Sequence, residues 1–176
     1  MPTVKLTYDD YLRIPDDGLR HEVLDGIHVV SPSAGSRHQH LQLRLCARFD
    51  EHVDRRGLGT VFPDLDCVLG PNDVVRPDLI VVLAAHADRI TATHVAGAPD
   101  LAIEILSPST AANDRGAKKA RCEARGVAEY WLVDADARTV EQFGLYDGSY
   151  RRLGVHAAAI QLAILPEVTL DLTMIW

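Results

Sequence analysis

The stretch Leu101-Ala102-Ile103-Glu104-Ile105-Leu106 decides the fold expected for this chain. It is a short apolar run with β-branched residues, bounded by Pro99-Asp100 and by Ser107-Pro108-Ser109, which is typical of a buried strand that runs into a turn. Glu104 stands in the middle of the run. An ionised carboxylate in a buried strand is costly unless a cation, a metal ion or several hydrogen-bond donors meet it. The sequence therefore predicts such a partner for Glu104.

A second apolar run, Val74–Leu83, carries one carboxylate, Asp78, and predicts another strand of the same sheet. Downstream of the first run, Ser109 or Thr110 can cap a helix expected from Ala111 to Arg125. A strand, a turn and a helix in succession bring the helix back beside the sheet. An aspartate, a glutamate and a lysine of this helix could therefore converge.

In the rest of the sequence, segments with the hydrophobic spacing of a helix alternate with segments that have the spacing of a strand. We expect a capped helix at Tyr8–Ile14, an amphipathic helix at about His38–Arg56, a helical turn and loop at Ala84–Ala98, an edge strand or loop at Ile160–Trp176, and strands at His21–Leu24, Ile27–Val30, Val61–Leu69, Glu129–Val133, Val140–Leu145 and Tyr150–Leu153. Asp25-Gly26 and Asp147-Gly148 are dipeptides favoured in tight hairpins. The prediction is one α/β (α+β) domain, residues 1–176, with a mixed central β-sheet flanked by helices.

The composition is that of a globular chain, with 47% hydrophobic and 24% charged residues. No apolar stretch approaches the roughly 20 residues that span a bilayer, and Met1–Asp10 lacks the apolar core of a signal peptide, so we expect a cytoplasmic protein without a membrane partner. Cys46, Cys67 and Cys122 form no CxxC pair and are expected to be reduced thiols. The net charge of −7 opposes nonspecific binding to nucleic acid unless the basic residues gather on one face.

Two carboxylates on adjacent strands are the ligands that a hard cation such as Mg²⁺ prefers, with water and a phosphate completing the shell. Such an ion activates water and stabilises charge on a phosphate, while a lysine orients the nucleophile or neutralises developing charge. The chemistry that Asp78, Glu104 and a nearby lysine favour is therefore phosphodiester hydrolysis.

Several motifs occur in a characteristic order along the chain. They are His21-Glu22-Val23-Leu24-Asp25-Gly26, Ser36-Arg37-His38-Gln39, Arg76-Pro77-Asp78, Glu104-Ile105-Leu106-Ser107-Pro108-Ser109-Thr110, Asp114-Arg115-Gly116 with Lys118, and Gly126-Val127-Ala128-Glu129-Tyr130-Trp131-Leu132-Val133-Asp134. At these residues the sequence resembles the Uma-type family of restriction endonucleases, a branch of the PD-(D/E)XK nuclease superfamily. The resemblance covers nearly the whole chain and implies a restriction-endonuclease-like fold and a Mg²⁺- or Mn²⁺-dependent nuclease acting on DNA, with no organic cofactor.

The resemblance also implies roles for individual residues. Asp78 and Glu104 would be the metal-binding carboxylates, the main-chain carbonyl of Ile105 would be a further ligand, and Glu22 would be an additional acid near the metal. The superfamily's usual lysine falls at Leu106 in this chain, so the family register moves that role to the following helix, at Lys118. Cys122 stands where that register usually has an aromatic residue.

Helical periodicity alone does not choose between the two lysines of this helix. Ala117, Ala120, Ala124 and Val127 mark its expected buried face, and both Lys118 and Lys119 lie well off the centre of that face. A pair of neighbouring lysines is usually solvated. The family register favours Lys118.

Simpler explanations exist for each residue. Asp78 could cap a turn, Glu104 could lie exposed on an edge strand, and Glu22 could be a surface residue paired with Arg20. Two other functions compete with a nuclease: a catalytically silent module that binds nucleic acid or protein, and a metal-dependent phosphohydrolase of small substrates, which the acidic charge favours. One basic cleft around the acids would support DNA, and scattered basic residues would oppose it. Because duplex cleavage requires two cuts, a symmetric homodimer is also expected.

Overall fold

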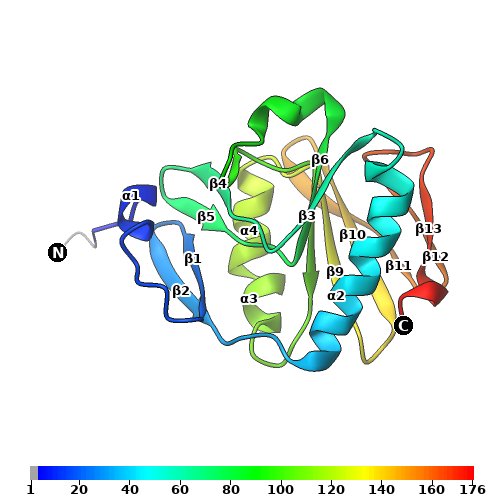
Figure 1. Ribbon diagram of the computed structural model, residues 1–176, viewed down its shortest axis with the longest axis horizontal. Helices are drawn as coiled ribbons and strands as arrows, with labels where there is room; N and C mark the ends of the chain where they lie inside the picture. The colour runs from blue at the N-terminus through cyan, green and yellow to red at the C-terminus, as the bar shows by residue number, and fades with distance from the viewer. Residues whose placement is uncertain (1–3) are drawn as a thin grey trace.

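The computed structural model describes residues 4–176, and a six-stranded sheet forms its centre (Figure 1). The strand order is β11-β10-β9-β8-β6-β3, where β8 and β9 are parallel and every other pair is antiparallel. The strands are β3 (Gly59–Pro63), β6 (Leu79–Leu83), β8 (Leu101–Ile105), β9 (Glu129–Asp134), β10 (Thr139–Tyr146) and β11 (Ser149–His156). This arrangement confirms the prediction of a mixed central sheet flanked by helices.

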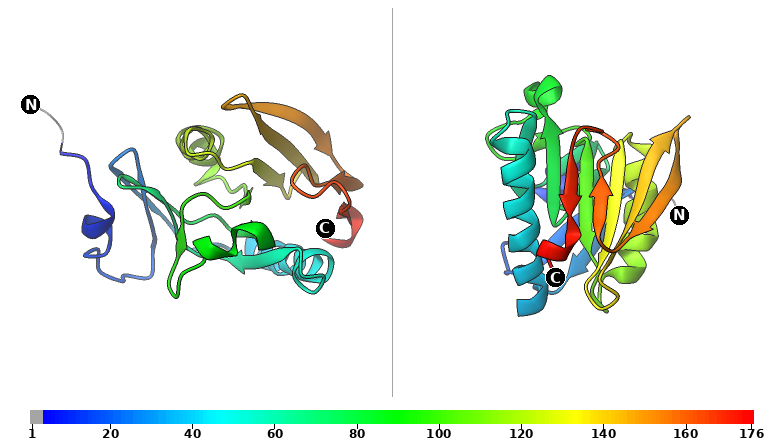
Figure 2. Two further views of the ribbon diagram at one scale, coloured as in Figure 1. Left: turned by 90° about the horizontal axis from the view of Figure 1, so that it is seen from above. Right: turned by 90° about the vertical axis from the view of Figure 1, so that its right-hand side faces the viewer.

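Helix α2 (Ser36–Phe49) covers one face of this sheet and continues into a π-helical turn, η1 (Asp50–Asp54) (Figure 2). Its apolar residues Leu41, Leu45 and Phe49 recur every four positions and are buried in one core with alternate residues of β6, β8 and β9. The predicted helix at His38–Arg56 is thus confirmed and begins two residues earlier.

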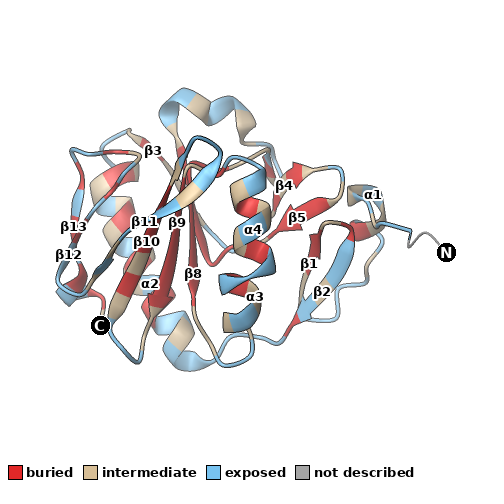
Figure 3. Ribbon diagram, turned by 180° about the vertical axis from the view of Figure 1, so that it is seen from behind, coloured by how far each residue is buried: buried red, intermediate tan, exposed pale blue. Residues whose placement is uncertain are grey.

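The opposite face of the central sheet is covered by α3 (Ala111–Arg115) and α4 (Ala117–Ala124) (Figure 3). One continuous helix from Ala111 to Arg125 was the expectation, and that expectation is wrong. Gly116 lies between the two segments with φ −107° and ψ −104°, far from helical values, so the helix is interrupted there.

A five-stranded sheet, ordered β2-β1-β5-β4-β7, lies beside this second face. Its strands are β1 (Arg20–Leu24), β2 (Ile27–Ser31), β4 (Cys67–Gly70), β5 (Asp73–Val75) and β7 (Val95–Ala96). Asp25 and Gly26 have φ of 52° and 78°, and Asp147 and Gly148 have 51° and 77°, which confirms both tight hairpins. Helix α1 (Tyr8–Tyr11) has the predicted capping box between Thr7 and Asp10 but ends earlier than Ile14.

Two apolar runs predicted as single strands are each divided between the two sheets. The run Val61–Leu69 becomes β3, which ends at Pro63, and β4, and the chain turns between them at Asp64, whose φ is 48°. The run Val74–Leu83 becomes β5 and β6, separated at Arg76-Pro77. Proline has no N–H to give to a strand ladder, so each break falls where pairing could not continue.

The C-terminal segment packs on the same face of the central sheet as α2. It forms β12 (Ala159–Gln161), β13 (Thr169–Asp171) and the 3₁₀ turn η3 (Leu172–Met174), while η2 (Ala84–Arg89) is a separate 3₁₀ segment. Buried Glu129 ties this segment to the sheet, because its carboxylate accepts hydrogen bonds from Trp131 Nε1, Gln142 Nε2 and the Ile164 N–H. The segment therefore forms part of the core.

The three cysteines are free thiols, and Cys67 and Cys122 are buried. Burial raises the pKa of Cys46 to about 11, so this thiol stays protonated at neutral pH. Among residues 4–176, no helix is both long and apolar enough to cross a membrane.

Candidate active site

Asp78 and Glu104 lie opposite one another on neighbouring strands. Strands β6 and β8 pair with Leu79 opposite Ile103, and one further step in this register places Asp78 opposite Glu104. Both side chains have the strand parity of Ile80 and therefore face α4. Each of the two residues is 1% exposed, so the structure buries both carboxylates rather than placing them on an edge or a turn.

Lys118 of α4 lies between two carboxylates of different sheets. Its Nζ is 2.7 Å from Glu22 Oε1 and 2.6 Å from Glu104 Oε1, and it donates a hydrogen bond to the Arg76 carbonyl at 3.2 Å. The Arg76 N–H in turn donates to Glu22 Oε1 at 2.7 Å. Burial opposes the charge on Lys118, but the charges of Glu104 and Glu22 outweigh it and raise the pKa of this lysine. The ammonium is therefore a permanent positive charge.

The sequence placed Lys118 off the buried face of its helix, and the structure shows otherwise. Lys118 is 1% exposed and shares its face with Cys122, four residues later. Lys119 instead lies over the aromatic rings of Phe143 and Tyr150, 4.1 and 5.3 Å from their centroids. Of the two lysines that periodicity could not separate, the structure brings Lys118 to the carboxylates.

Asp78 is surrounded by donors. Arg20 NH2 donates to its Oδ1 at 2.7 Å, the Ile105 N–H donates to its Oδ2 at 2.7 Å, and His38 Nε2 lies 3.0 Å from the same oxygen. Burial opposes ionisation, but the His38 hydrogen bond and the Arg20 charge outweigh it and lower the pKa of Asp78 to about 2. Asp78 is therefore an anion throughout the physiological range.

Carboxylates outnumber the cations in this cluster. We name Glu22, Asp78, Glu104 and Asp114 the carboxylate cluster, and all four are buried. Among the described residues, Lys118 and Arg20 are the two permanent positive charges that contact these carboxylates. Burial raises the pKa of Glu104 well above its usual range and that of Asp114 to about 6. A buried excess of negative charge attracts a proton or a metal ion.

A cavity of about 710 Å³ adjoins the cluster. It reaches the three groups that contact Asp78, namely Arg20, His38 and Ile105. Its wall also includes the Ser31–Gln39 loop and helix start and the Ile105–Thr110 turn. Its volume is in the range of sites that hold small molecules or a few linked groups. A substrate in this cavity would therefore lie against the side of the cluster that carries Asp78.

The residues present fit a hard divalent cation. Within the described residues, buried Glu104 Oε1 makes no hydrogen bond, and Lys118 meets it as an ion pair only. No group of three or more His, Cys, Asp or Glu side chains in residues 4–176 converges on one point. Mg²⁺ requires no such group, since it is commonly bound by one or two carboxylates with waters and phosphate oxygens. In this conformation Arg20 and Lys118 compensate part of the charge of the carboxylates.

The structure brings together the four predicted catalytic residues Glu22, Asp78, Glu104 and Lys118, although they come from three strand regions and one helix. Sequence reasoning named Arg20 as an alternative surface partner of Glu22, and it gave neither Arg20 nor Asp114 a role in the site. Arg20 stands two residues before Glu22 on one strand, so strand parity alone could have placed it at the site.

Of the other basic residues, Arg37 and Arg76 also line the cavity, whereas Arg115, Arg121 and Arg125 do not. Arg37 pairs with Asp136, Arg115 with Glu141, and Arg121 and Arg125 both pair with buried Asp73. These pairs lie on different elements, and each cation already has a carboxylate partner. These basic residues are scattered over the surface, and such a distribution opposes tight electrostatic binding of a long DNA duplex.

Comparisons with known proteins agree on the type of protein. The profile of the Uma2 family, described as "Putative restriction endonuclease", matches residues 8–173. A crystal structure from Anabaena variabilis, of "a putative nuclease belonging to DUF820", superposes with a TM-score of 0.79 at 23% identity and covers 97% of each chain. No curated protein matches the sequence. At that identity the superposition establishes the restriction-endonuclease-like fold, and the profile match over nearly the whole sequence shows that the chain belongs to the Uma2 family.

Proposed function

We propose that the protein is a Mg²⁺- or Mn²⁺-dependent nuclease that hydrolyses phosphodiester bonds in DNA, acting as one cytoplasmic domain of residues 1–176. The observation that carries the proposal is the buried excess of carboxylates beside the cavity. Family membership and the nuclease among the similar structures support it. The three free thiols support the location, since reduced cysteines are typical of the cytoplasm.

In this proposal Asp78 and Glu104 bind the metal, with the Ile105 carbonyl as a further ligand. The N–H of Ile105 donates a hydrogen bond to Asp78 Oδ2 and so fixes the position of that carboxylate. When bound, the ion activates water and stabilises negative charge on the phosphate. Arg20 would then release Asp78 and remain at the cavity, where a guanidinium suits a phosphate oxygen.

Lys118 acts as a fixed charge in this scheme. Because its pKa is raised, it cannot accept a proton from water at neutral pH, so it orients the attacking water or neutralises charge that develops in the transition state. Glu22 and Glu104 both pair with Lys118, so Glu22 helps to hold its ammonium in place. These roles require Glu22 and Lys118 to act as a pair.

The test is cleavage of supercoiled plasmid and of single-stranded DNA with Mg²⁺, Mn²⁺ or EDTA. Wild-type protein should nick DNA only with a metal, and Asp78→Ala, Glu104→Ala and Lys118→Met should each lose at least a hundredfold in rate. Lys119→Met is the matched control and should retain activity, since Lys119 lies on aromatic rings. Equal nicking by all variants would reveal a contaminating nuclease and refute the site.

A phosphohydrolase of small substrates is the second candidate, and the paired basic residues favour it. Hydrolysis of bis(p-nitrophenyl) phosphate separates the two. Turnover of this diester without DNA cleavage would select the small-substrate enzyme, and metal binding without either activity would select a silent binding module. The expected homodimer also remains a proposal, and sedimentation equilibrium tests it.

A further inference from the structure

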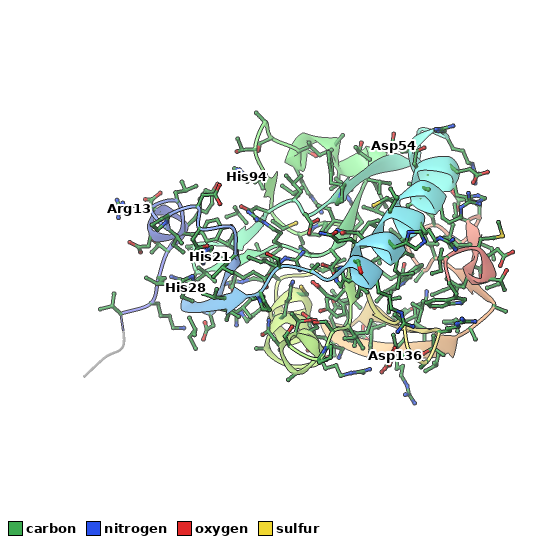
Figure 4. All side chains as sticks on the ribbon, turned by 60° about the horizontal axis from the view of Figure 1, so that its bottom comes forward. Arg13, His21, His28, Asp54, His94 and Asp136 are labelled. Atoms are coloured by element: carbon green, nitrogen blue, oxygen red, sulfur yellow. The ribbon has the colours of Figure 1, made fainter. Side chains whose placement is uncertain are left out.

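A second polar cluster lies on the opposite face of β1 from the carboxylates. It consists of Asp17, His21 and His28. Successive residues of a strand point to opposite faces, so Glu22 faces the carboxylate cluster while His21 faces away from it. Figure 4 shows His21 and His28 close together on the β1–β2 hairpin. The proposed hydrolysis gives these residues no role.

The two imidazoles meet edge to edge. His21 Nδ1 and His28 Nε2 are 2.9 Å apart, the ring centroids are 5.1 Å apart, and the ring planes differ by 20°. The centroids are farther apart than the nitrogens by the full sum of the two distances from each ring centre to its own nitrogen. Both nitrogens therefore lie close to the line that joins the ring centres. The two nitrogens therefore point at one another in nearly one plane.

Strand register produces this contact. His21 pairs with Val30 and Val23 pairs with His28, so the two histidines are diagonal neighbours across the antiparallel ladder. Such neighbours on one face of a sheet are close enough for long and aromatic side chains to meet. The hairpin backbone thus holds both rings without any further loop.

Asp17 fixes the orientation of the first ring. Its Oδ1 accepts a hydrogen bond from the Leu19 N–H at 2.9 Å and lies 2.8 Å from His21 Nε2. A carboxylate at Nε2 places a hydrogen on that nitrogen and leaves the lone pair of Nδ1 directed toward His28. A carboxylate behind one ring nitrogen and a lone pair on the other is the arrangement found in metal-ligating histidines. Here that lone pair accepts a hydrogen bond from His28 Nε2, and an ion would take the place of the shared hydrogen.

We propose that His21 Nδ1 and His28 Nε2 bind a borderline transition-metal dication, represented by Zn²⁺, with Asp17 as the positioning residue and water in the remaining positions. Imidazole suits Zn²⁺, Cu²⁺ and Ni²⁺, whereas Mg²⁺ prefers oxygen. With Zn–N bonds of about 2.0–2.1 Å and tetrahedral angles, the nitrogens would stand roughly 3.4 Å apart. They need to separate by about half an ångström, and each lone pair must turn by roughly 35° from the line between the nitrogens so that both meet at the ion. Rotation of the exposed side chain of His28, with a smaller tilt of His21, can provide this change.

The chemistry of this site separates it from the carboxylate cluster. It offers two imidazole nitrogens near the surface, and the carboxylate cluster offers buried oxygens. A two-histidine site is also compatible with the absence of any three-residue metal cluster from residues 4–176. The ion would link β1 to β2 on the face of β1 opposite the side chains of Arg20 and Glu22.

The test is calorimetric titration of the full chain with Zn²⁺ in an Asp78→Asn, Glu104→Gln background, with excess Mg²⁺ present, so that the carboxylate cluster does not contribute. One Zn²⁺ should bind per chain. His21→Gln and His28→Gln should each lower the affinity at least tenfold, and Asp17→Asn should lower it roughly 10- to 100-fold. His40→Gln, which changes an exposed histidine on α2, is the matched control and should leave the affinity unchanged.

Unchanged Zn²⁺ affinity in both His21→Gln and His28→Gln would overturn the proposal, as would the absence of binding in the background protein. Imidazole ¹H–¹⁵N spectra of the wild type provide a measurement that needs no variant. Zn²⁺ should shift the ring signals of His21 and His28 ahead of those of other histidines, and the reverse order would also overturn the proposal. Neither measurement depends on nuclease activity, so the result on Zn²⁺ binding can be interpreted even if the proposed function is wrong.

Discussion

Replacement of Lys118 by methionine is the most direct test of the charge arrangement described above. The substitution keeps a long, flexible side chain and removes the only ammonium that contacts both Glu22 and Glu104 in the described residues. Removing one partner of a buried ion pair typically costs about 3–5 kcal/mol, because the remaining charge stays buried without compensation. Here two carboxylates lose their partner, so we expect a loss at the upper end of this range near pH 8.

Equilibrium urea unfolding measures this loss, with the fluorescence of buried Trp131 as a probe. For an m value of about 2 kcal/mol/M, a loss of about 4 kcal/mol lowers the midpoint by about 2 M. Lys119→Met is the matched control. It removes a cation from the faces of Phe143 and Tyr150, an interaction worth about 0.5–1 kcal/mol at exposed sites, so its midpoint should move far less.

The pH dependence of the Lys118→Met effect gives a second criterion. Burial raises the pKa of Glu104, and loss of the neighbouring ammonium would raise it further. As pH falls toward 5, Glu104 takes up a proton in the variant and the destabilisation should shrink. A midpoint equal to that of Lys119→Met at pH 8, or a difference that grows as the pH falls, would refute the reasoning.

Three further outcomes are expected. Burial raises the pKa of Asp114 from 3.8 to about 6, so the fold loses stability as pH rises from about 4 to about 6, and the loss is complete above that pH. Asp114→Asn should therefore raise the free energy of unfolding by up to about 3 kcal/mol at pH 8 and little at pH 4. Because the basic residues are paired, the slope of log K against log salt for duplex DNA, measured by anisotropy, should be no steeper than about −3. Gly26→Ala should lower the thermal midpoint more than Gly148→Ala, because both residues have positive φ but only the Gly26 Cβ would lie 2.4 Å from Lys5 Cβ.

Features of the fold that depend on neighbouring residues were predictable from the sequence. The dipeptides Asp25-Gly26 and Asp147-Gly148 adopt positive φ because their own chemistry permits it, and the Thr7–Asp10 capping box forms within one turn. The burial of Glu104 followed from the apolar residues on either side of it. In each case the deciding contact lies within a few residues of the pattern.

Features that depend on distant segments were not predictable in the same way. The run Val74–Leu83 has continuous apolar character, and only the presence of two sheets explains why it divides at Pro77. Similarly, the helical spacing of the apolar residues predicted that Lys118 would lie off the buried face, because that pattern takes only apolar residues into account. Its burial is favourable because Glu22, 96 positions earlier in the chain, lies within ion-pair distance. No local pattern contains that information.

The opposition of Asp78 and Glu104 at the end of the β6–β8 ladder also limits how the chain can misfold. If β6 slipped by one residue against β8, Asp78 would turn toward the apolar core under α2, away from Arg20 and His38. An unpaired carboxylate in that core would cost several kcal/mol, comparable to much of the stability of a domain. The charges that we assign to catalysis therefore also select the correct strand alignment during folding, before any substrate is bound.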